Sequence, residues 1–274
     1  MASAVGSGPV RIGVLHSITG TMAVSEWPLV DAALMAVDEV NQAGGLLGRH
    51  IEPIVADGAS DPATFARQAQ ELLQSGVVSI FGCWTSASRK AVRPVVEAAG
   101  TLLWYPVQYE GLEQSPSIIY MGSCLNQQVA PALEWATEHL GSRVFLIGSD
   151  YVFPRTANRL VRSMVETREG GGSIVGEVYA ALGQQGFADA LGQIAEQAPD
   201  FVLNTLNGDS NLAFYQQAHA AGLNARQTPI LAVSAAETEL LQVAQMAAGH
   251  LACWSYFQSL DNPENHRFVA DFRA

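Results

Sequence analysis

GCWTSASRKAVRPVVEAAGTLLWYPVQYEG, residues 82–111, follows a short β-branched run and contains one helical pattern. Residues 77–81 before it predict a buried strand that ends at a glycine. Ser86 has the residue type of an N-cap, and residues 87–99 predict a helix that stops at another glycine. Residues 101–105 predict a second strand, which a proline ends. This order of strand, helix and strand indicates a parallel pair in an α/β sheet.

The same alternation continues in both directions along the chain. Further strands are predicted at 10–16, 51–56, 118–122, 144–148, 173–179, 201–206, 229–233 and 251–257, and helices at 26–43, 61–76, 127–139, 154–169, 187–197, 211–221, 236–247 and from 266. Alternating elements predict parallel sheets with helices on both faces and right-handed crossovers. The rhythm restarts near residues 122–128, and the strands are too many for one doubly wound sheet.

We therefore predict two doubly wound parallel-sheet lobes joined by a hinge. Residues 9–123 form the N-terminal α/β lobe, residues 124–252 form the C-terminal α/β lobe, and residues 253–274 return to the first lobe and complete only part of it. One continuous sheet is the alternative.

Composition narrows the classes of function. The chain of 274 residues is 49% hydrophobic and carries a formal charge of −12, so a globular fold is expected and direct nucleic-acid binding is not. It has no apolar run of the roughly 18 residues that a membrane span needs. The first residues lack the features of a secretory signal, so we expect a cytoplasmic protein if Met1 is native and an extracytoplasmic one if a signal was removed. Three separated cysteines, Cys83, Cys124 and Cys253, predict small buried side chains and neither a disulfide framework nor a zinc site.

Polar and aromatic side chains follow the two strands of the opening segment. In an open parallel sheet, ligands bind beyond the carboxyl ends of the strands. The candidates are Trp84, Thr85, Ser86, Tyr105, Gln108 and Tyr109. Rings would flank a flat ligand, the helix N-terminus at Ser86 would attract a carbonyl oxygen, and Gln108 would both donate and accept. Core packing of the two rings and simple capping by Ser86 are the alternatives.

The second lobe offers its own strand-end candidates. They are Asp150, Tyr151, Asp209, Ser234 and Glu237. Glu237, in the first turn of a predicted helix, could accept from an NH₂ group, or it could simply be a carboxylate that the helix dipole favours. Asp209 has the alternative role of capping the next helix. In the first lobe, Ser17 and Thr19 are weaker candidates, and His16 is expected to be a hydrogen-bonded wall residue.

Enzymatic signatures are missing from the sequence. There is no G-x-S-x-G elbow and no H-E-x-x-H spacing. The glycines of residues 44–48 follow a helix, the reverse of what a phosphate loop needs. Arg89 and Lys90 are expected to be solvated. The sequence therefore predicts no enzyme, no cofactor and no metal.

Several long stretches resemble one family. They are IGVLHSITGTMAVSE (12–26), VADGASDPATFA (55–66), FGCWTSASRKAV (81–92), LLWYPVQYEG (102–111), GSDYVFPRTAN (148–158) and NTLNGDSN (204–211). Through them the chain resembles the type I periplasmic binding proteins, and within these the urea and short-chain amide-binding group. The resemblance implies two lobes that close on a ligand, non-catalytic binding of urea or a short-chain amide in the cleft between them, and delivery to an ABC permease. It also implies that Tyr151 faces the amide and that family members continue beyond this chain, with more of the first lobe.

Three other functions remain open. The same site could serve a cytosolic or fused amide sensor that acts on a signalling partner. A branched-chain amino-acid binder would use Asp150, Asp209 or Glu237 for the ammonium and Ser86 for the carboxylate. An amidohydrolase is the alternative from another class, although a nucleophile with its base and metal ligands are both missing from the pattern.

Overall fold

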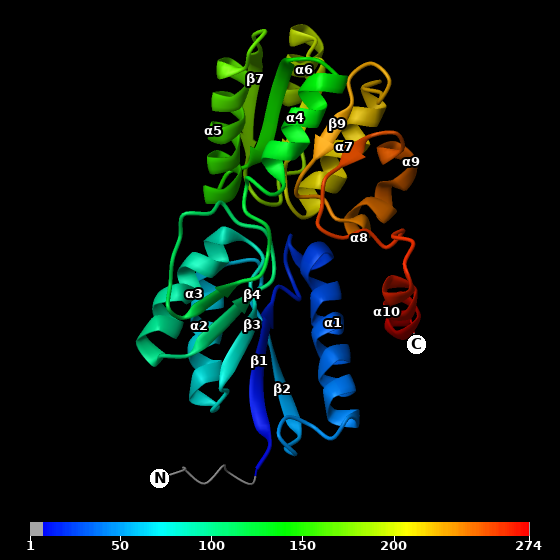
Figure 1. Ribbon diagram of the computed structural model, residues 1–274. Helices are drawn as coiled ribbons and strands as arrows, with labels where there is room; N and C mark the ends of the chain where they lie inside the picture. The colour runs from blue at the N-terminus through cyan, green and yellow to red at the C-terminus, as the bar shows by residue number, and fades with distance from the viewer. Residues whose placement is uncertain (1–7, 274) are drawn as a thin grey trace. The chain divides into compact units, whose positions relative to one another are not determined.

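A parallel sheet in the order β2-β1-β3-β4-β5 forms the centre of the first of two units in the computed structural model, which describes residues 8–273 (Figure 1). Its strands are β1 (Val10–His16), β2 (Ile51–Asp57), β3 (Ser79–Gly82), β4 (Leu102–Tyr105) and β5 (Ile118–Tyr120). Its helices are α1 (Ala23–Gln42), α2 (Pro62–Gln74) and α3 (Ser86–Ala99). Helix α1 packs on β1 and β2, while α2 and α3 lie together on the other face.

Close packing explains why β1 carries a glycine. A Cβ on Gly13 would lie 2.9 Å from Cδ1 of Leu72, a buried residue of α2. The buried side chains of Phe65 and Leu72 on α2 and of Val92 and Val96 on α3 follow helical spacing, which gives each helix one apolar face. Burial of these faces against the sheet forms the core of unit 1.

The second unit has a sheet in the order β10-β9-β8-β6-β7. Its strands are β6 (Arg143–Ser149), β7 (Ser173–Ala180), β8 (Phe201–Thr205), β9 (Ile230–Ala232) and β10 (Leu251–Ala252). Its helices are α4 (Val129–His139), α5 (Val152–Thr167), α6 (Ala188–Gln197), α7 (Asp209–Ala220), α8 (Glu237–Leu240) and α9 (Ala244–Ala247), with a 3₁₀ turn at Leu241–Val243.

Strand β6 divides the core of unit 2 into two layers. Val144 and Leu146 are buried in a cluster with α4 and α5, while Phe145 and Ile147 are buried in a second cluster with α6 and α7. Side chains alternate between the faces of a strand, so an uninterrupted apolar strand needs helices on both sides. The predicted fold class, two parallel-sheet α/β lobes, is confirmed, and the alternative of one continuous sheet is wrong.

Three predicted elements near the end of the chain differ from the structure in extent. The strand expected at 251–257 has only the two residues of β10, because the carbonyl of Cys253 accepts from a side chain instead of continuing the ladder. The helix expected at 236–247 is broken at the buried Val243, whose φ of −125° and ψ of 25° are not helical. Helix α10 (Pro263–Arg273) begins earlier than expected, with a proline in its first turn.

The chain divides between the units at places other than the predicted boundaries. Unit 1 runs to Val107 and also takes Gln114–Met121 and the residues from Arg267 onward, whereas unit 2 takes Gln108–Glu113 and Gly122–His266. Residues 253–266 stay with unit 2 because they bond to it, for example through Gln258 N, which donates to Glu237 Oε2 at 2.6 Å. Among the described residues, no helix has both the length and the apolar character that crossing a membrane requires.

Candidate ligand-binding site

Each sheet reverses its strand order at one point. In unit 1 the chain runs from β1 to β2 on one side and then places β3 on the other, and in unit 2 it runs from β6 to β7 and then places β8 on the other side. Ligands of open parallel sheets bind outside the carboxyl ends of the strands at such reversals. The loops after β1 and β3, and those after β6 and β8, are therefore the candidate sites of the two units.

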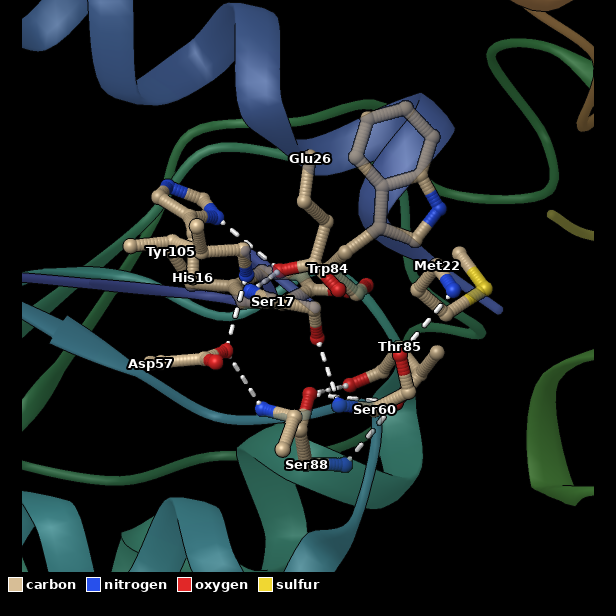
Figure 2. A network of polar contacts seen from close by, with 12 residues as sticks. His16, Ser17, Met22, Glu26, Asp57, Ser60, Trp84, Thr85, Ser88 and Tyr105 are labelled. Atoms are coloured by element: carbon tan, nitrogen blue, oxygen red, sulfur yellow. Dashed lines mark hydrogen bonds and ion pairs between the residues drawn. The ribbon is translucent and has the colours of Figure 1, made fainter. Parts of the chain in front are cut away.

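Two carboxylates fix the loop after β1 (Figure 2). Glu26 Oε2 lies 3.1 Å from Nδ1 of His16 and accepts from the backbone N–H of Ser17 at 2.9 Å. His16 and Glu26 are only 3% and 1% exposed. His16 is thus a hydrogen-bonded residue, as the sequence analysis expects.

Asp57, at the end of β2, holds the next part of the same loop. Its carboxylate accepts from the backbone N–H of Ile18 at 2.8 Å and from the Thr19 hydroxyl at 2.6 Å. Burial alone would raise the pKa of Asp57, but the hydrogen bonds from Thr19, Ala59 and Ile18 outweigh it and lower that pKa. Thr19 is therefore bound to Asp57, and Ser17 is buried and accepts from Ser60 N at 3.0 Å.

The turn after β3 approaches β1 very closely. A Cβ on Gly82 would lie 1.9 Å from the carbonyl oxygen of Leu15, and the next residue, Cys83, has a φ of 65° and is buried. Trp84 follows and is 6% exposed. Its backbone carbonyl accepts from the hydroxyl of Tyr105 at 2.5 Å. Bonded in this way, the turn places Trp84 directly before α3.

Thr85, and not Ser86, caps helix α3. Thr85 has an extended backbone, and its Oγ1 accepts from the backbone N–H of Ser88 at 3.0 Å. Ser86 is the first helical residue, and its Oγ accepts from Nη1 of Arg89 at 3.0 Å. The predicted cap was wrong by one residue because both hydroxyl side chains suit the position and only the backbone conformation separates them.

Arg89 is fully buried, which contradicts the expectation that it is solvated. Its Cζ lies 4.8 Å from the ring centroid of Tyr105 and 5.7 Å from that of Tyr120. The sequence did contain a signal for this. Arg89 precedes the buried Val92 and Val96 by three and seven residues, so it lies on the apolar face of α3.

Tyr105 is fully buried as well, so its ring lies within the packed interior and its hydroxyl is used by Trp84. Gln108 and Tyr109 belong to unit 2. Gln108 is buried, with its Nε2 3.4 Å from the carbonyl oxygen of Val233, and Tyr109 N donates to Ser123 O at 3.1 Å. Unit 1 therefore brings together Trp84, Thr85, Ser86 and Tyr105.

Two carboxylates predicted in unit 2 have protein partners. Asp150 pairs with Arg155 at 2.6 Å, and the hydrogen bond from Arg155 lowers the pKa of Asp150. Glu237 Oε2 accepts from the backbone N–H of Gln258. Tyr151 stands just before α5 and packs partly buried against the core layer of α4 and α5.

Asp209 and Ser234 have different surroundings. Asp209 is the first residue of α7, after Gly208 with a φ of 62°, and burial raises the pKa of its carboxyl group. Ser234 is fully buried, and its Oγ has no hydrogen-bond partner among residues 8–273. These two are the predicted residues of unit 2 with no polar side-chain contact to another described residue.

Sequence reasoning missed a buried polar group at the start of α7. Glu239 is fully buried and accepts from Nδ2 of Asn211 at 3.0 Å, and Asn211 in turn lies 3.0 Å from Asn204. Asn204, Asn207 and Asn211 fall within eight residues at a strand end, and that density of asparagine was the available signal. In the described part of the chain, no three His, Cys, Asp or Glu side chains cluster as a metal site would require.

Known proteins are similar to this chain in sequence. The Leucine-, isoleucine-, valine-, threonine-, and alanine-binding protein of Pseudomonas aeruginosa is 29% identical over 97 residues, 35% of this chain and 26% of that protein. Leu/Ile/Val-binding protein homolog 6 of Brucella melitensis is 23% identical over 99% of this chain and 70% of its own length. The chain thus matches about a quarter of the first relative and about two thirds of the second.

Solved structures agree on the fold. A solute binding protein of an ABC transporter from R. palustris, in complex with 4-hydroxybenzoate, superposes with a TM-score of 0.85 at 22% identity, over 97% of this chain and 73% of that one. The branched-chain amino acid transporter substrate binding protein LivJ from Streptococcus pneumoniae, in complex with isoleucine, gives 0.82 at 20% identity, over 97% and 76%. Residues 10–274 match the family described as periplasmic binding protein domain, and the chain belongs to that family.

Proposed function

We propose that this chain is a non-catalytic binding protein for urea or a short-chain amide and serves as the solute-binding component of an ABC uptake system. The observation that carries the proposal is the position of Trp84. It stands at the carboxyl end of β3, directly before the N-terminus of α3, with its carbonyl held by Tyr105. An aromatic side chain beside a helix N-terminus suits a flat ligand that carries a carbonyl oxygen.

The charges at this edge of unit 1 favour a neutral ligand. Glu26 interacts with His16 and Ser17, and Asp57 accepts hydrogen bonds from the loop after β1. Arg89 donates to Ser86 and lies over the two aromatic rings described above. Charged groups that are already paired contribute little to binding a ligand of opposite charge, whereas dipoles and ring faces remain suited to a neutral one. Similar structures described as ABC transporter proteins support transport over a sensor role. The cleft between lobes that the sequence predicts stays a prediction.

Amino-acid binding is the second candidate, and Asp209 favours it. The pKa of its half-buried carboxyl group is raised by burial, and an ammonium group next to it would compensate that cost. The curated relatives, named for leucine, isoleucine and valine, support the same alternative. An amide would use Asp209 only as a hydrogen-bond acceptor.

Calorimetric titration with urea, acetamide and leucine tests the proposal. We expect urea or acetamide to bind and Trp84→Ala to weaken that binding at least about tenfold, which is about 1.4 kcal/mol. Trp27→Ala is the matched control, because Trp27 is 48% exposed on α1, and it should bind as the wild type does. Binding of leucine alone, abolished by Asp209→Asn, would refute the amide proposal and establish the second candidate.

A further inference from the structure

One buried glutamine joins two distant strand ends in unit 2. Gln128 is the N-cap residue of α4 and is 4% exposed. Its Nε2 donates to the carbonyl of Val233 at 3.0 Å and to the carbonyl of Cys253 at 2.7 Å, residues 105 and 125 positions further along the chain. A side-chain NH₂ group has two hydrogens, so these two bonds use both.

The two carbonyls lie where β9 and β10 separate. Ala232 of β9 pairs with Ala252 of β10, and Cys253 N still donates to Ala232 O at 2.9 Å. Beyond this rung the described strands do not pair again. A backbone carbonyl that is shielded from water needs a donor, and the Gln128 amide supplies one to the buried Val233 and one to the partly buried Cys253. The side chain thus takes the place of the next rung of the ladder.

The two carbonyls that Gln128 binds lie next to a predicted ligand residue and to the start of a long segment. Val233 precedes Ser234, which is fully buried and whose hydroxyl has no partner in the described chain. Cys253 begins the segment that ends at His266, the last residue of unit 2. Gln108, another predicted ligand residue, also approaches the Val233 carbonyl, at the longer distance of 3.4 Å. The contact with Cys253 is reciprocal, since its Sγ lies 3.7 Å from Gln128 O.

We propose that Gln128 is a positioning residue that fixes Ser234 and the start of segment 253–266 for ligand binding. It acts through the backbone of Val233 and Cys253 and does not touch the ligand. The effect on ligand affinity rests on the proposed function, whereas the effect on local backbone order does not.

Hydrogen exchange followed by mass spectrometry tests the local effect without ligand. Gln128→Met keeps an unbranched side chain of similar length and removes both donors. We expect exchange at least about tenfold faster in peptides covering residues 230–238 and 250–258, with exchange in β6 unchanged. Gln193→Met, on an exposed position of α6, is the matched control and should exchange as the wild type does.

Titration then tests the consequence for binding. Affinity for whichever of urea, acetamide or leucine the wild type binds should fall at least about tenfold in Q128M and stay unchanged in Q193M. If Q128M does not fold, Gln128→Asn, which keeps the amide but is one methylene shorter, should show the same local increase in exchange.

Two results would overturn the inference. One is unchanged exchange in both peptides, and the other is faster exchange throughout unit 2, β6 included, which would make Gln128 a general stabilising residue. A wild type that binds none of the three ligands would refute the proposed function, and the exchange data would still decide the role of Gln128.

Discussion

Tyr105→Phe removes a single hydroxyl group from the interior of unit 1. The ring is fully buried, and its hydroxyl donates to the backbone carbonyl of Trp84 at 2.5 Å. Phenylalanine keeps the ring beneath Arg89, so the change removes the hydroxyl group and leaves the ring contact in place. A net hydrogen bond contributes about 1 kcal/mol, and a buried acceptor left without a donor costs about 1–3 kcal/mol. We therefore expect the free energy of unfolding to fall by about 1–3 kcal/mol.

Differential scanning calorimetry measures this loss and resolves the transition of unit 1 if the two units unfold separately. For a domain of this size the loss corresponds to a drop in melting temperature of roughly 3–10 °C. Tyr256→Phe is the matched control, since its hydroxyl donates to Asn265 Oδ1 at 2.6 Å from a residue that is 40% exposed. Tyr256→Phe should lower the free energy of unfolding by less than Tyr105→Phe does, because this hydrogen bond is only partly buried. A melting temperature of unit 1 that is the same in Tyr105→Phe as in the wild type would show that the Tyr105 hydroxyl does not hold Trp84.

Three further predictions concern residues of unit 1, the last of them in comparison with a cysteine of unit 2. Gly82→Ala should lower the free energy of unfolding by more than about 2 kcal/mol, because the added Cβ would clash with the Leu15 carbonyl. Gly100 has a left-handed φ, but the space around its Cβ position is open. Gly100→Ala should therefore lower the free energy of unfolding by about 1 kcal/mol in the same calorimetric assay. The pKa of Asp57 is lower in the folded protein than the value of 3.8 expected in the unfolded chain. The ionised carboxylate therefore stabilises the fold at any pH above 3.8, and this stabilisation is lost as the pH falls through the folded-state pKa. The stability difference between wild type and Asp57→Asn should therefore shrink from about pH 6 to about pH 3, and a constant difference would contradict this. Burial raises the pKa of Cys83, so iodoacetamide should modify the partly exposed Cys124 before it modifies Cys83. Mass spectrometry detects which cysteine has reacted. Modification of Cys83 in the folded protein would show that the turn after β3 opens.

Elements set by local pattern were predictable from the sequence. Strand β1 has the predicted bounds, because an apolar run between polar neighbours specifies it without reference to the rest of the chain. Helix α3 ends at Gly100 in a left-handed conformation, the function that glycine has at a helix end. The strand expected at 251–257 failed because its end depends on Gln128, which is 125 residues away from Cys253 and has no local signature.

The roles of two carboxylates in unit 2 also depend on residues that are distant in sequence. Glu237 and Glu239 are two residues apart, and both lie in the first turn of α8. One accepts from the backbone of Gln258 and the other is buried against Asn211, and neither partner is near in sequence. Helix position alone therefore favours both residues equally. Only the tertiary contacts determine which of the two is available near the surface and which belongs to the interior.

The polar groups around Trp84 also bear on how a ligand would be selected. Thr85 is used in capping α3, the loop after β1 is bonded to Glu26 and Asp57, and the carbonyl of Trp84 is bonded to Tyr105. The conformational cost of ordering these groups is met on folding, so a ligand encounters them already in place. Affinity at this edge should then depend on how firmly the protein holds Trp84, as well as on direct contacts. Tyr105→Phe, which alters no exposed group, should for that reason weaken urea or acetamide binding, whereas Trp27→Ala, at an exposed position of α1, should not.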